Sequence, residues 1–195
     1  DNGRIARIEP RKRNEAHRLI EEAMLAANVC AAEFIAEHGH PALYRVHEGP
    51  TTEKRITLQN YLKAMGLGMS LSDDPTPGEL QAIATATRDR PDASQIHTML
   101  LRSMQQARYT AANSGHFGLA YEAYTHFTSP IRRYPDLLVH RGIKAVLQGE
   151  KLPAKGLAEV GAHCSLTERR ADDATRDVDA WLKTYFMQDR IGDEY

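Results

Sequence analysis

The sequence predicts a mixed α+β fold that is mainly α-helical and includes a few short strands. Long segments repeat apolar residues at helical spacing, whereas a few short segments have the pattern of strands. Hydrophobic residues make up 42% and charged residues 26% of the 195 positions, proportions that are ordinary for a globular protein. The chain is therefore long enough to form one core or a piece of a larger domain.

The first third of the chain predicts a short strand, a long helix and a second strand. Residues 4–8 alternate as a strand would, and Asn14 is a suitable N-cap for a helix from Glu15 to about His38. Residues 41–49 then predict another strand. The apolar positions of the long helix keep helical spacing at Ala16, Leu19, Ile20, Ala23, Met24, Ala27, Ala31 and Phe34.

The middle third predicts three helices separated by turns. Residues 51–66 have the pattern of a capped helix that stops at a glycine, and residues 67–78 are rich in turn formers. A small helix follows at 79–87, and Pro91 begins the third helix. The inward stripe of that third helix comprises Ile96, Met99, Leu100, Met104 and Ala107.

The last third predicts two adjoining strands and two more helices. A turn at 109–115 leads into strands at 116–120 and 123–128. The first helix is expected from residue 130 to about 148, and the second continues to about residue 192.

The composition argues against several kinds of protein. The net charge of -1 does not by itself indicate nucleic-acid binding, so any anion site must be local. Cys30 and Cys164 lie far apart without a CxxC pair, and we expect buried free thiols in a reducing cytosol. No segment approaches the apolar length of a membrane span and the N-terminus lacks a signal-peptide pattern, so a cytoplasmic location is expected.

The segment Ser129-Pro130-Ile131-Arg132-Arg133 is the first candidate site. Ser129 is a good N-cap and Pro130 suits the first helical position, so both arginines would lie in the first turn of a helix. Cations there oppose the helix dipole by roughly 0.3–1 kcal/mol each, which favours a bound anion such as phosphate. The alternative is that both arginines pair with neighbouring carboxylates or reach solvent.

Glu21 is the second candidate site. On a helical wheel it lies beside Leu25, Asn28, Ala32 and Ile35, at the border of the apolar stripe. A carboxylate beside small and apolar groups is unfavourable unless it is paired or binds a ligand. An internal ion pair and a ligand contact both remain open.

Two further patterns allow alternative interpretations. In Gly115-His116-Phe117-Gly118 an aromatic ring could stack on a base, although a turn with a packed ring is the alternative. An acidic cluster near the C-terminus could be imagined as a magnesium site, but interleaved arginines favour a solvated helix face. No paired Cys/His spacing indicates zinc.

The stretch "HFGLAYEAYTHFTSPIRRYPDLLVHR" resembles the C-terminal half of the catalytic domain of the ribonuclease II / ribonuclease R (RNB) exoribonucleases. The segments "EEAMLAANVCAAEFI", "MLLRSMQQARY" and "ERRADDATRDVDAWLKTYFMQDRIG" agree in order, and the likeness is greater to the ribonuclease R branch. The resemblance implies a partial RNB catalytic domain whose strands belong to a larger sheet. It places an aspartate-bearing half, cold-shock-like barrels and an S1 barrel outside residues 1–195.

The same resemblance implies a 3′-to-5′ hydrolytic exoribonuclease that degrades single-stranded RNA to nucleoside 5′-monophosphates with Mg²⁺. Arg132 would stabilise the transition state, and Glu21 would contact the ribose of the 3′-terminal nucleotide. Positions near the RNA channel would be Arg133, Tyr134, His116 and Ser129. Because the magnesium ligands would lie upstream, residues 1–195 alone are expected to be inactive. The resemblance also implies that the intact protein is a monomer, and no membrane partner is expected.

Two other functions are kept as alternatives. The first is a non-catalytic RNA-binding or scaffold module, which would hold RNA without hydrolysing it. The second is a helical interaction domain that binds no nucleic acid, for which RNA binding would be weak and independent of salt.

Overall fold

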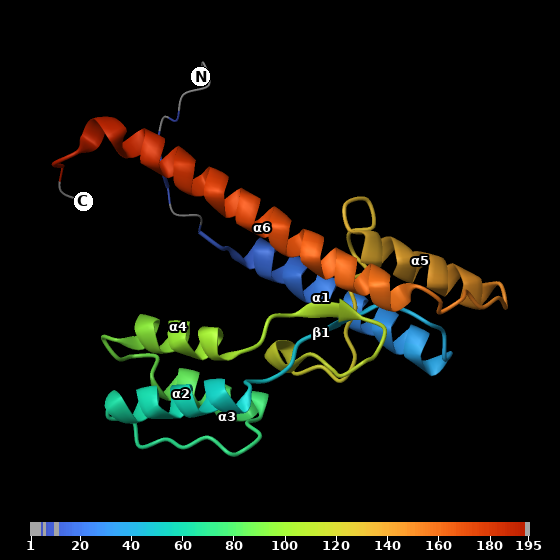
Figure 1. The fold of residues 1–195 in the computed structure, drawn as a ribbon, viewed down its shortest axis with the longest axis horizontal. Coiled ribbons are helices and arrows are strands. Elements are labelled where there is room, and N and C mark those ends of the chain that lie inside the picture. The colour runs from blue at the N-terminus through green and yellow to red at the C-terminus, as the bar shows by residue number, and fades with distance from the viewer. Residues whose placement is uncertain (1–4, 6, 10–11, 194–195) are drawn as a thin grey trace.

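The computed structural model describes Ile5, residues 7–9 and residues 12–193, and that part of the chain is a mainly helical α+β structure (Figure 1). The α-helices are α1 (Glu15–Glu37), α2 (Thr52–Ala64), α3 (Pro77–Ala86), α4 (Ala93–Ser103), α5 (Tyr134–Leu147) and α6 (Leu157–Met187). The other elements are β1 (Tyr44–Val46), β2 (Arg108–Thr110) and the 3-10 helices η1 (Phe117–Leu119) and η2 (Gln188–Arg190). This architecture confirms the predicted fold class.

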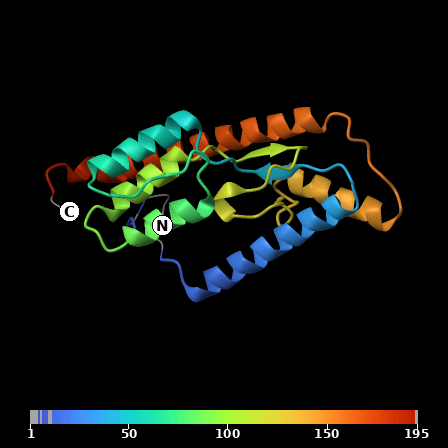
Figure 2. The same ribbon diagram turned by 90° about the horizontal axis from the view of Figure 1, so that it is seen from below.

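The helices form two groups: α2, α3 and α4, and the helices α1, α5 and α6 that surround a short sheet. Helices α2, α3 and α4 pack together at one end, whereas α6 and α1 lie on opposite sides of the sheet (Figure 2). The buried apolar residues of the first group are Leu58, Leu62, Leu71, Leu80, Ile83, Ile96 and Leu100. Those around α1, α5 and the sheet are Ala31, Ala32, Ile35, Ala42, Tyr44, Val46 and Val139.

The helices of the first half begin where the sequence places their caps. The Asn14 side chain accepts a hydrogen bond from the His17 amide, and the His17 side chain accepts from the Asn14 amide. Thr51 caps α2, and Thr76 and Glu79 form a reciprocal capping box at α3. Such caps satisfy backbone donors within one turn of chain, so they can be predicted from local sequence.

The predicted strands of the last third are wrong. Strand β2 pairs antiparallel with β1, with Tyr109 opposite Arg45, in a segment that was assigned in part to a turn. Residues 116–120 bend through η1, and residues 123–128 carry no strand. This second segment makes its hydrogen bonds to scattered partners rather than to a neighbouring strand, as when the Arg45 amide donates to the Tyr124 carbonyl (2.9 Å).

The two strand predictions near the N-terminus have different outcomes. The predicted strand at 41–49 is present but limited to β1. The predicted strand at 4–8 falls partly on residues outside those described, and Ile5, Arg7 and Ile8 have no regular secondary structure.

Helix α5 begins at Tyr134 rather than at Pro130, so Arg132 and Arg133 do not lie in its first turn. A helix that continued from Pro130 would enclose Pro135, which has no N–H to donate and whose ring would clash with the carbonyl four residues earlier. Proline is tolerated only in a first turn, so the helix begins one residue before Pro135. Ser129 is therefore not the N-cap, which is Arg133.

Helix α6 approaches strand β2 closely through small residues. The Ser165 hydroxyl donates to the Gly161 carbonyl (2.8 Å) and accepts from the Tyr109 amide (2.9 Å). A Cβ atom at Gly161 would lie 2.8 Å from the Tyr109 carbonyl oxygen. The absence of a side chain at position 161 therefore lets the helix backbone lie against the strand.

Replacing Gly161 with alanine is expected to lower the free energy of unfolding. Because the clashing atom belongs to the backbone, the clash should cost about 2–3 kcal/mol, the upper part of the usual range for overpacking. A helix-propensity gain of about 1 kcal/mol offsets part of this cost, for a net loss of about 1–2 kcal/mol. Urea denaturation measures this loss, and the exposed replacement His163→Ala in the same helix is the control. A Gly161→Ala protein as stable as the control would contradict the close approach.

Some apolar side chains of α1 and α6 are exposed. The predicted stripe of α1 is covered only toward its C-terminus, since Leu19 and Ile20 are 70% and 59% exposed, whereas Ala31 is buried. On α6, the exposed rings of Trp181 and Tyr185 stack with centroids 5.8 Å apart. No other residue of the described chain covers these faces.

The two cysteines differ in exposure. Cys164 is buried, as expected, and burial raises the pKa of its thiol. Cys30 is exposed on α1, so the expectation that both thiols are buried is wrong for this residue. Within the described residues no helix has both the length and the apolar character needed to cross a membrane.

Candidate functional site

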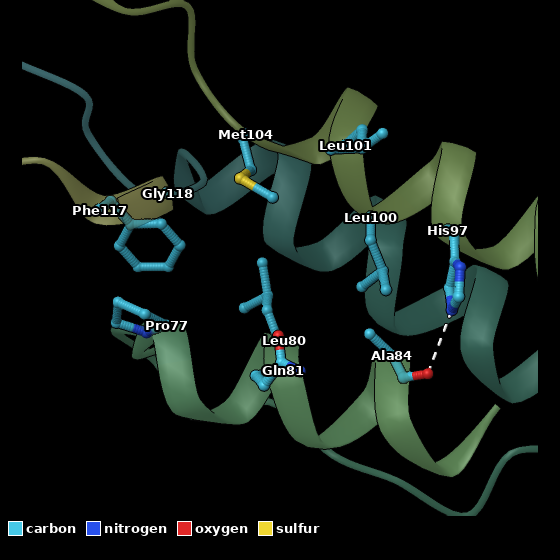
Figure 3. Close-up of a pocket in the computed structure, with 10 residues that line it drawn as sticks. All are labelled: Pro77, Leu80, Gln81, Ala84, His97, Leu100, Leu101, Met104, Phe117 and Gly118. Carbon is cyan, nitrogen blue, oxygen red and sulfur yellow. Dashed lines mark hydrogen bonds between the residues drawn. The ribbon is translucent and has the colours of Figure 1, made fainter. Parts of the chain in front are cut away.

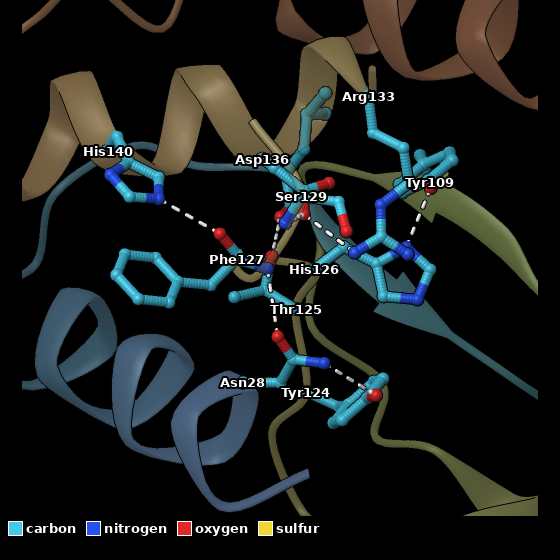
Figure 4. Close-up of polar contacts among 11 residues, drawn as sticks. Asn28, Tyr109, Tyr124, Thr125, His126, Phe127, Ser129, Arg133, Asp136 and His140 are labelled. Atoms are coloured by element: carbon cyan, nitrogen blue, oxygen red, sulfur yellow. Dashed lines mark hydrogen bonds and ion pairs between the residues drawn. The ribbon is translucent and has the colours of Figure 1, made fainter. Parts of the chain in front are cut away.

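The segment 129–133 forms a turn that precedes α5. The Ser129 carbonyl accepts hydrogen bonds from the amides of Arg132 (3.3 Å) and Arg133 (3.0 Å). The Ser129 amide donates to Asp136 Oδ1 (2.7 Å), and Arg133 Nη2 donates to the same oxygen (2.7 Å). Both ends of the turn are thereby attached to one carboxylate on α5, as Figure 4 shows.

The two arginines of this turn have different environments. Arg133 is half-buried and pairs with Asp136, which matches the alternative of a carboxylate partner. Arg132 is exposed, and its side chain has no hydrogen bond or ion pair within the described part of the chain. Arg132 is therefore the cation of this pair that is available to a ligand.

A cleft of ≈ 430 Å³ lies beside the turn. Its lining includes Arg132, Arg133 and Tyr134 from the turn and the start of α5, and Glu168 and Asp172 from α6. Glu168 is bound by Arg45 from β1 (2.6 Å), so one of the two acidic groups is already neutralised by an internal partner. The structure thus brings three predicted site residues to one cleft, with Ser129 behind them.

Behind the turn lies a buried polar layer. The Tyr109 hydroxyl and His126 Nδ1 are 2.7 Å apart, and the Arg45 guanidinium lies over the Tyr109 ring, 4.6 Å from its centroid. Burial, together with the charges of Arg133 and Arg45, lowers the pKa of His126 to about 3. Burial also raises the pKa of Tyr109. Both groups are therefore uncharged near neutral pH, and the arginines supply the positive charge of the site.

Asn28 attaches helix α1 to the loop that leads into the turn. Its Nδ2 donates to the Tyr124 hydroxyl (2.9 Å), and its Oδ1 accepts from the Phe127 amide (2.9 Å) (Figure 4). His140 on α5 is 2.9 Å from the Phe127 carbonyl through Nε2, and its ring stacks on the Phe127 ring. The loop before the turn is thus fixed between α1 and α5.

Glu21 lies on the exposed N-terminal half of α1. It forms an ion pair with Arg13, which matches the ion-pair alternative, and both side chains are exposed. Glu21 is two turns before Asn28 on the same side of the helix, because residues seven apart share a face. Glu21 therefore lies on the same face of α1 as Asn28, the residue that binds the loop before the turn.

His116 is packed near the beginning of the same loop rather than in the Arg132 cleft. Its ring lies 5.0 Å from the His47 ring and 5.2 Å from the Tyr124 ring. Burial and the neighbouring His47 lower the pKa of His116 to about 4. Its Nδ1 accepts from the Leu119 amide (3.2 Å), which supports the interpretation as a turn with a packed ring.

A second cleft, of ≈ 320 Å³, lies between α3 and α4 and is lined mainly by apolar side chains (Figure 3). Leu80, Leu100 and Met104 line it, and Phe117 closes one end. His97 Nε2 lies 3.1 Å from the Ala84 carbonyl and connects the two helices. Phe117 thus packs against this helical group, and none of the predicted site residues faces the cleft.

Sequence reasoning missed the residues that hold the turn in place. Asp136 and Asn28 are both buried, and the helical wheel indicates Asn28 only as a neighbour of Glu21. The position of Asp136, immediately after a proline at a helix start, is a local signal that could have drawn attention to it. The partners of Asn28 lie 96 and 99 residues away, and no local pattern could reveal them.

The described residues do not fit a divalent-metal site. They contain no group of three or more His, Cys, Asp or Glu side chains placed to hold a metal ion. The aspartates of α6 are exposed, and Asp173 and Asp179 form ion pairs with Arg176 and Lys183 on the same helix. They are part of a solvated helix face.

Comparison with known proteins identifies the class. Residues 1–149 match the family described as the RNB domain, so the chain belongs to the RNB family and the predicted resemblance is confirmed. Its relatives are ribonuclease R proteins: that of Escherichia coli is 47% identical over 205 residues, which cover 98% of this chain and 25% of the relative. The chain thus spans about a quarter of the length of that relative.

Solved structures agree with this classification. The apo form of Mycoplasma genitalium RNase R has a TM-score of 0.87 at 25% identity, covering 93% of this chain and 30% of the other. The same protein in complex with ribose methylated single-stranded RNA has a TM-score of 0.81 at 25% identity, with the same coverage. Yeast Ssd1, a pseudonuclease, has a TM-score of 0.68 at 28% identity, covering 78% of this chain and 20% of the other.

Proposed function

We propose that the intact protein containing this chain is a 3′-to-5′ hydrolytic exoribonuclease that degrades single-stranded RNA to nucleoside 5′-monophosphates. The observation that carries the proposal is the exposed guanidinium of Arg132, which has no partner within the described residues. This guanidinium belongs to a chain of the RNB family. The similarity to ribonuclease R supports it, as does the structural likeness to an RNase R in complex with RNA. The proposal includes a monomeric protein in the cytoplasm.

Arg132 is proposed to stabilise the charge that develops on the phosphoryl oxygens during hydrolysis. Phosphoryl transfer depends mainly on positioning and on electrostatic stabilisation, and a fixed guanidinium provides both. The neutral Tyr109 and His126 behind the turn add no competing charge. Tyr134, which is 49% exposed at the start of α5, is proposed to contact the RNA beside Arg132, and Ser129 to support the turn.

RNB nucleases depend in general on metal ions, but the described residues do not provide a site for one. We therefore assign no step of the reaction to a metal through this chain. The proposal places ligands for Mg²⁺ in an aspartate-bearing half of the domain outside residues 1–195. Cold-shock-like barrels and an S1 barrel would also lie outside, and residues 1–195 alone would be inactive.

Degradation of an RNA labelled at its 5′ end tests the function directly. The intact protein with Mg²⁺ should release nucleoside 5′-monophosphates while the labelled strand shortens from its 3′ end. Strand shortening from the 5′ end, or internal cleavage, would contradict the proposal.

A non-catalytic RNA-binding or scaffold module is the second candidate. The likeness to yeast Ssd1, a pseudonuclease, favours it, because the same fold occurs there in a protein named as inactive. RNA that is bound but not shortened in the same assay would establish this alternative. RNA that is neither bound nor shortened would instead indicate an interaction domain.

Glu21 is proposed to accept a hydrogen bond from a ribose hydroxyl of the 3′-terminal nucleotide, exchanging Arg13 for that partner. In the intact protein, Glu21→Ala should reduce the preference for RNA over DNA by about 10-fold, the value of one hydrogen bond to a charged group. Binding titrations with matched RNA and DNA strands measure it. The control is Glu22→Ala, an exposed neighbour, and an equal effect of both variants would contradict the assignment.

A further inference from the structure

Asp136 is a fully buried carboxylate that joins the two ends of the turn 129–133. Its side chain is 0% exposed, and its Oδ1 accepts from the Ser129 amide and from the Arg133 guanidinium. Burial of a charged carboxylate is unfavourable unless hydrogen bonds and a counter-charge compensate for the lost water. Both kinds of partner come from the turn, so the carboxylate holds a specific conformation of that turn.

Hydrogen bonds within the turn restrain the backbone of Arg132. Ser129, three residues before Arg132, is bonded through its amide to Asp136 and through its carbonyl to the Arg132 amide. Arg133, the next residue, is attached to Asp136 through its side chain. The backbone of Arg132 is therefore fixed on both sides, while its guanidinium remains exposed at the cleft.

We propose that Asp136 is a positioning residue for Arg132, which it places at the cleft through Ser129 and Arg133. Arg133 accordingly acts as the internal partner of Asp136 rather than as a contact of the RNA. The inference rests on the proposed function, because it assigns to Arg132 the contact with the reacting phosphate. Asp136 itself does not touch the substrate.

The ion pair of Arg133 and Asp136 is largely shielded from solvent. The Asp136 side chain is 0% exposed and that of Arg133 is 19% exposed. Water therefore screens the pair only weakly, which strengthens the interaction between the two charges. A pair shielded in this way can hold the turn more rigidly than an exposed ion pair.

A double-mutant cycle in the intact protein tests the proposal. Asp136→Asn preserves shape but removes the charge, and it should lower kcat for RNA hydrolysis by about 10²-fold with KM changed by less than about threefold, because small misplacements of catalytic groups are costly. In an Arg132→Ala background the same change should lower kcat by less than about threefold, since the two residues act as a unit. Equal losses of kcat in both backgrounds would overturn the proposal.

Arg133→Gln provides a second cycle in case Asp136→Asn does not fold. Arg133 is less buried than Asp136, and its replacement removes one attachment of the turn. In the Arg132→Ala background, Arg133→Gln should no longer lower kcat, and it should not reduce RNA affinity in either background. A loss of RNA affinity that persists without Arg132 would identify Arg133 as a direct contact of the RNA and overturn the positioning role.

Hydrogen exchange separates failure of this inference from failure of the proposed function. In Asp136→Asn the Ser129 amide should exchange about 10-fold faster, as expected when a hydrogen bond to a charged group is weakened to one with a neutral amide. Unchanged exchange in the folded variant would overturn the clamp, whatever the kinetics. An Arg132→Ala protein with normal kcat and normal exchange would instead contradict the catalytic role of Arg132.

Discussion

Replacing Arg132 with alanine in the intact protein is expected to lower kcat for RNA hydrolysis by about 10²–10³-fold, the effect typical of removing one preorganised group that stabilises a transition state. RNA affinity should change by less than about threefold, because the many backbone phosphates of the RNA contribute most of the binding. The guanidinium is exposed and has no partner among the described residues, so it is free to contact the reacting phosphate. Single-turnover kinetics and equilibrium binding measure the two quantities separately.

Two control variants sharpen this prediction. Arg141→Ala removes an exposed arginine from α5, outside the lining of the Arg132 cleft, and should leave kcat unchanged. Arg132→Lys keeps the charge but loses the planar donor geometry, so it should restore only part of the activity. Parallel losses of kcat and affinity in Arg132→Ala would mean that Arg132 binds RNA without acting in the chemical step.

Replacing Asn28 with alanine is expected to destabilise the protein by about 2–4 kcal/mol. The change removes both hydrogen bonds that attach the loop to α1 and leaves the Phe127 amide and the Tyr124 hydroxyl without this partner. Asn28 is only 3% exposed, so water cannot readily replace the lost side chain. Urea denaturation followed by circular dichroism measures the free energy of unfolding.

The matched control for this variant is Glu33→Ala, an exposed position on the same helix that should change stability by less than about 0.5 kcal/mol. A crystal structure of Asn28→Ala would show whether a water molecule takes over the two hydrogen bonds. A loss of stability no larger than that of the control would show that the loop does not depend on α1.

The parts of the fold that could be predicted are those set by neighbouring residues. The caps at Asn14, Thr51 and Thr76 act within a single turn, and the helices after the first two begin where expected. Helix α3 begins at Pro77, two residues before its predicted start. The pairing of β1 with β2 depends on residues far apart in the chain, and strands of three residues carry almost no periodic signal. The predicted start of α5 at Pro130 is wrong because Pro135 cannot lie in the interior of a helix.

The candidate site was predicted in part for similar reasons. An unusual concentration of positive charge marks Arg132 in the sequence itself, and the structure places this residue beside an open cleft. The distinction between Arg132 and Arg133 depends on which of them meets a buried carboxylate, and that is a property of the folded state. The location of Glu21 on an uncovered part of α1 likewise depends on where tertiary contacts end.

The loop that carries the site obtains its conformation from distant parts of the chain. The Tyr124 hydroxyl and the Phe127 amide bind a side chain 96 and 99 residues earlier, and the Thr125 hydroxyl donates to the Leu43 carbonyl, 82 residues earlier. Contacts of such long sequence separation form slowly, because the entropy of closing the intervening chain must be overcome first. On the ribosome, Asn28 emerges 96 and 99 residues before its two partners, so the loop can reach its final conformation only after those partners have been translated.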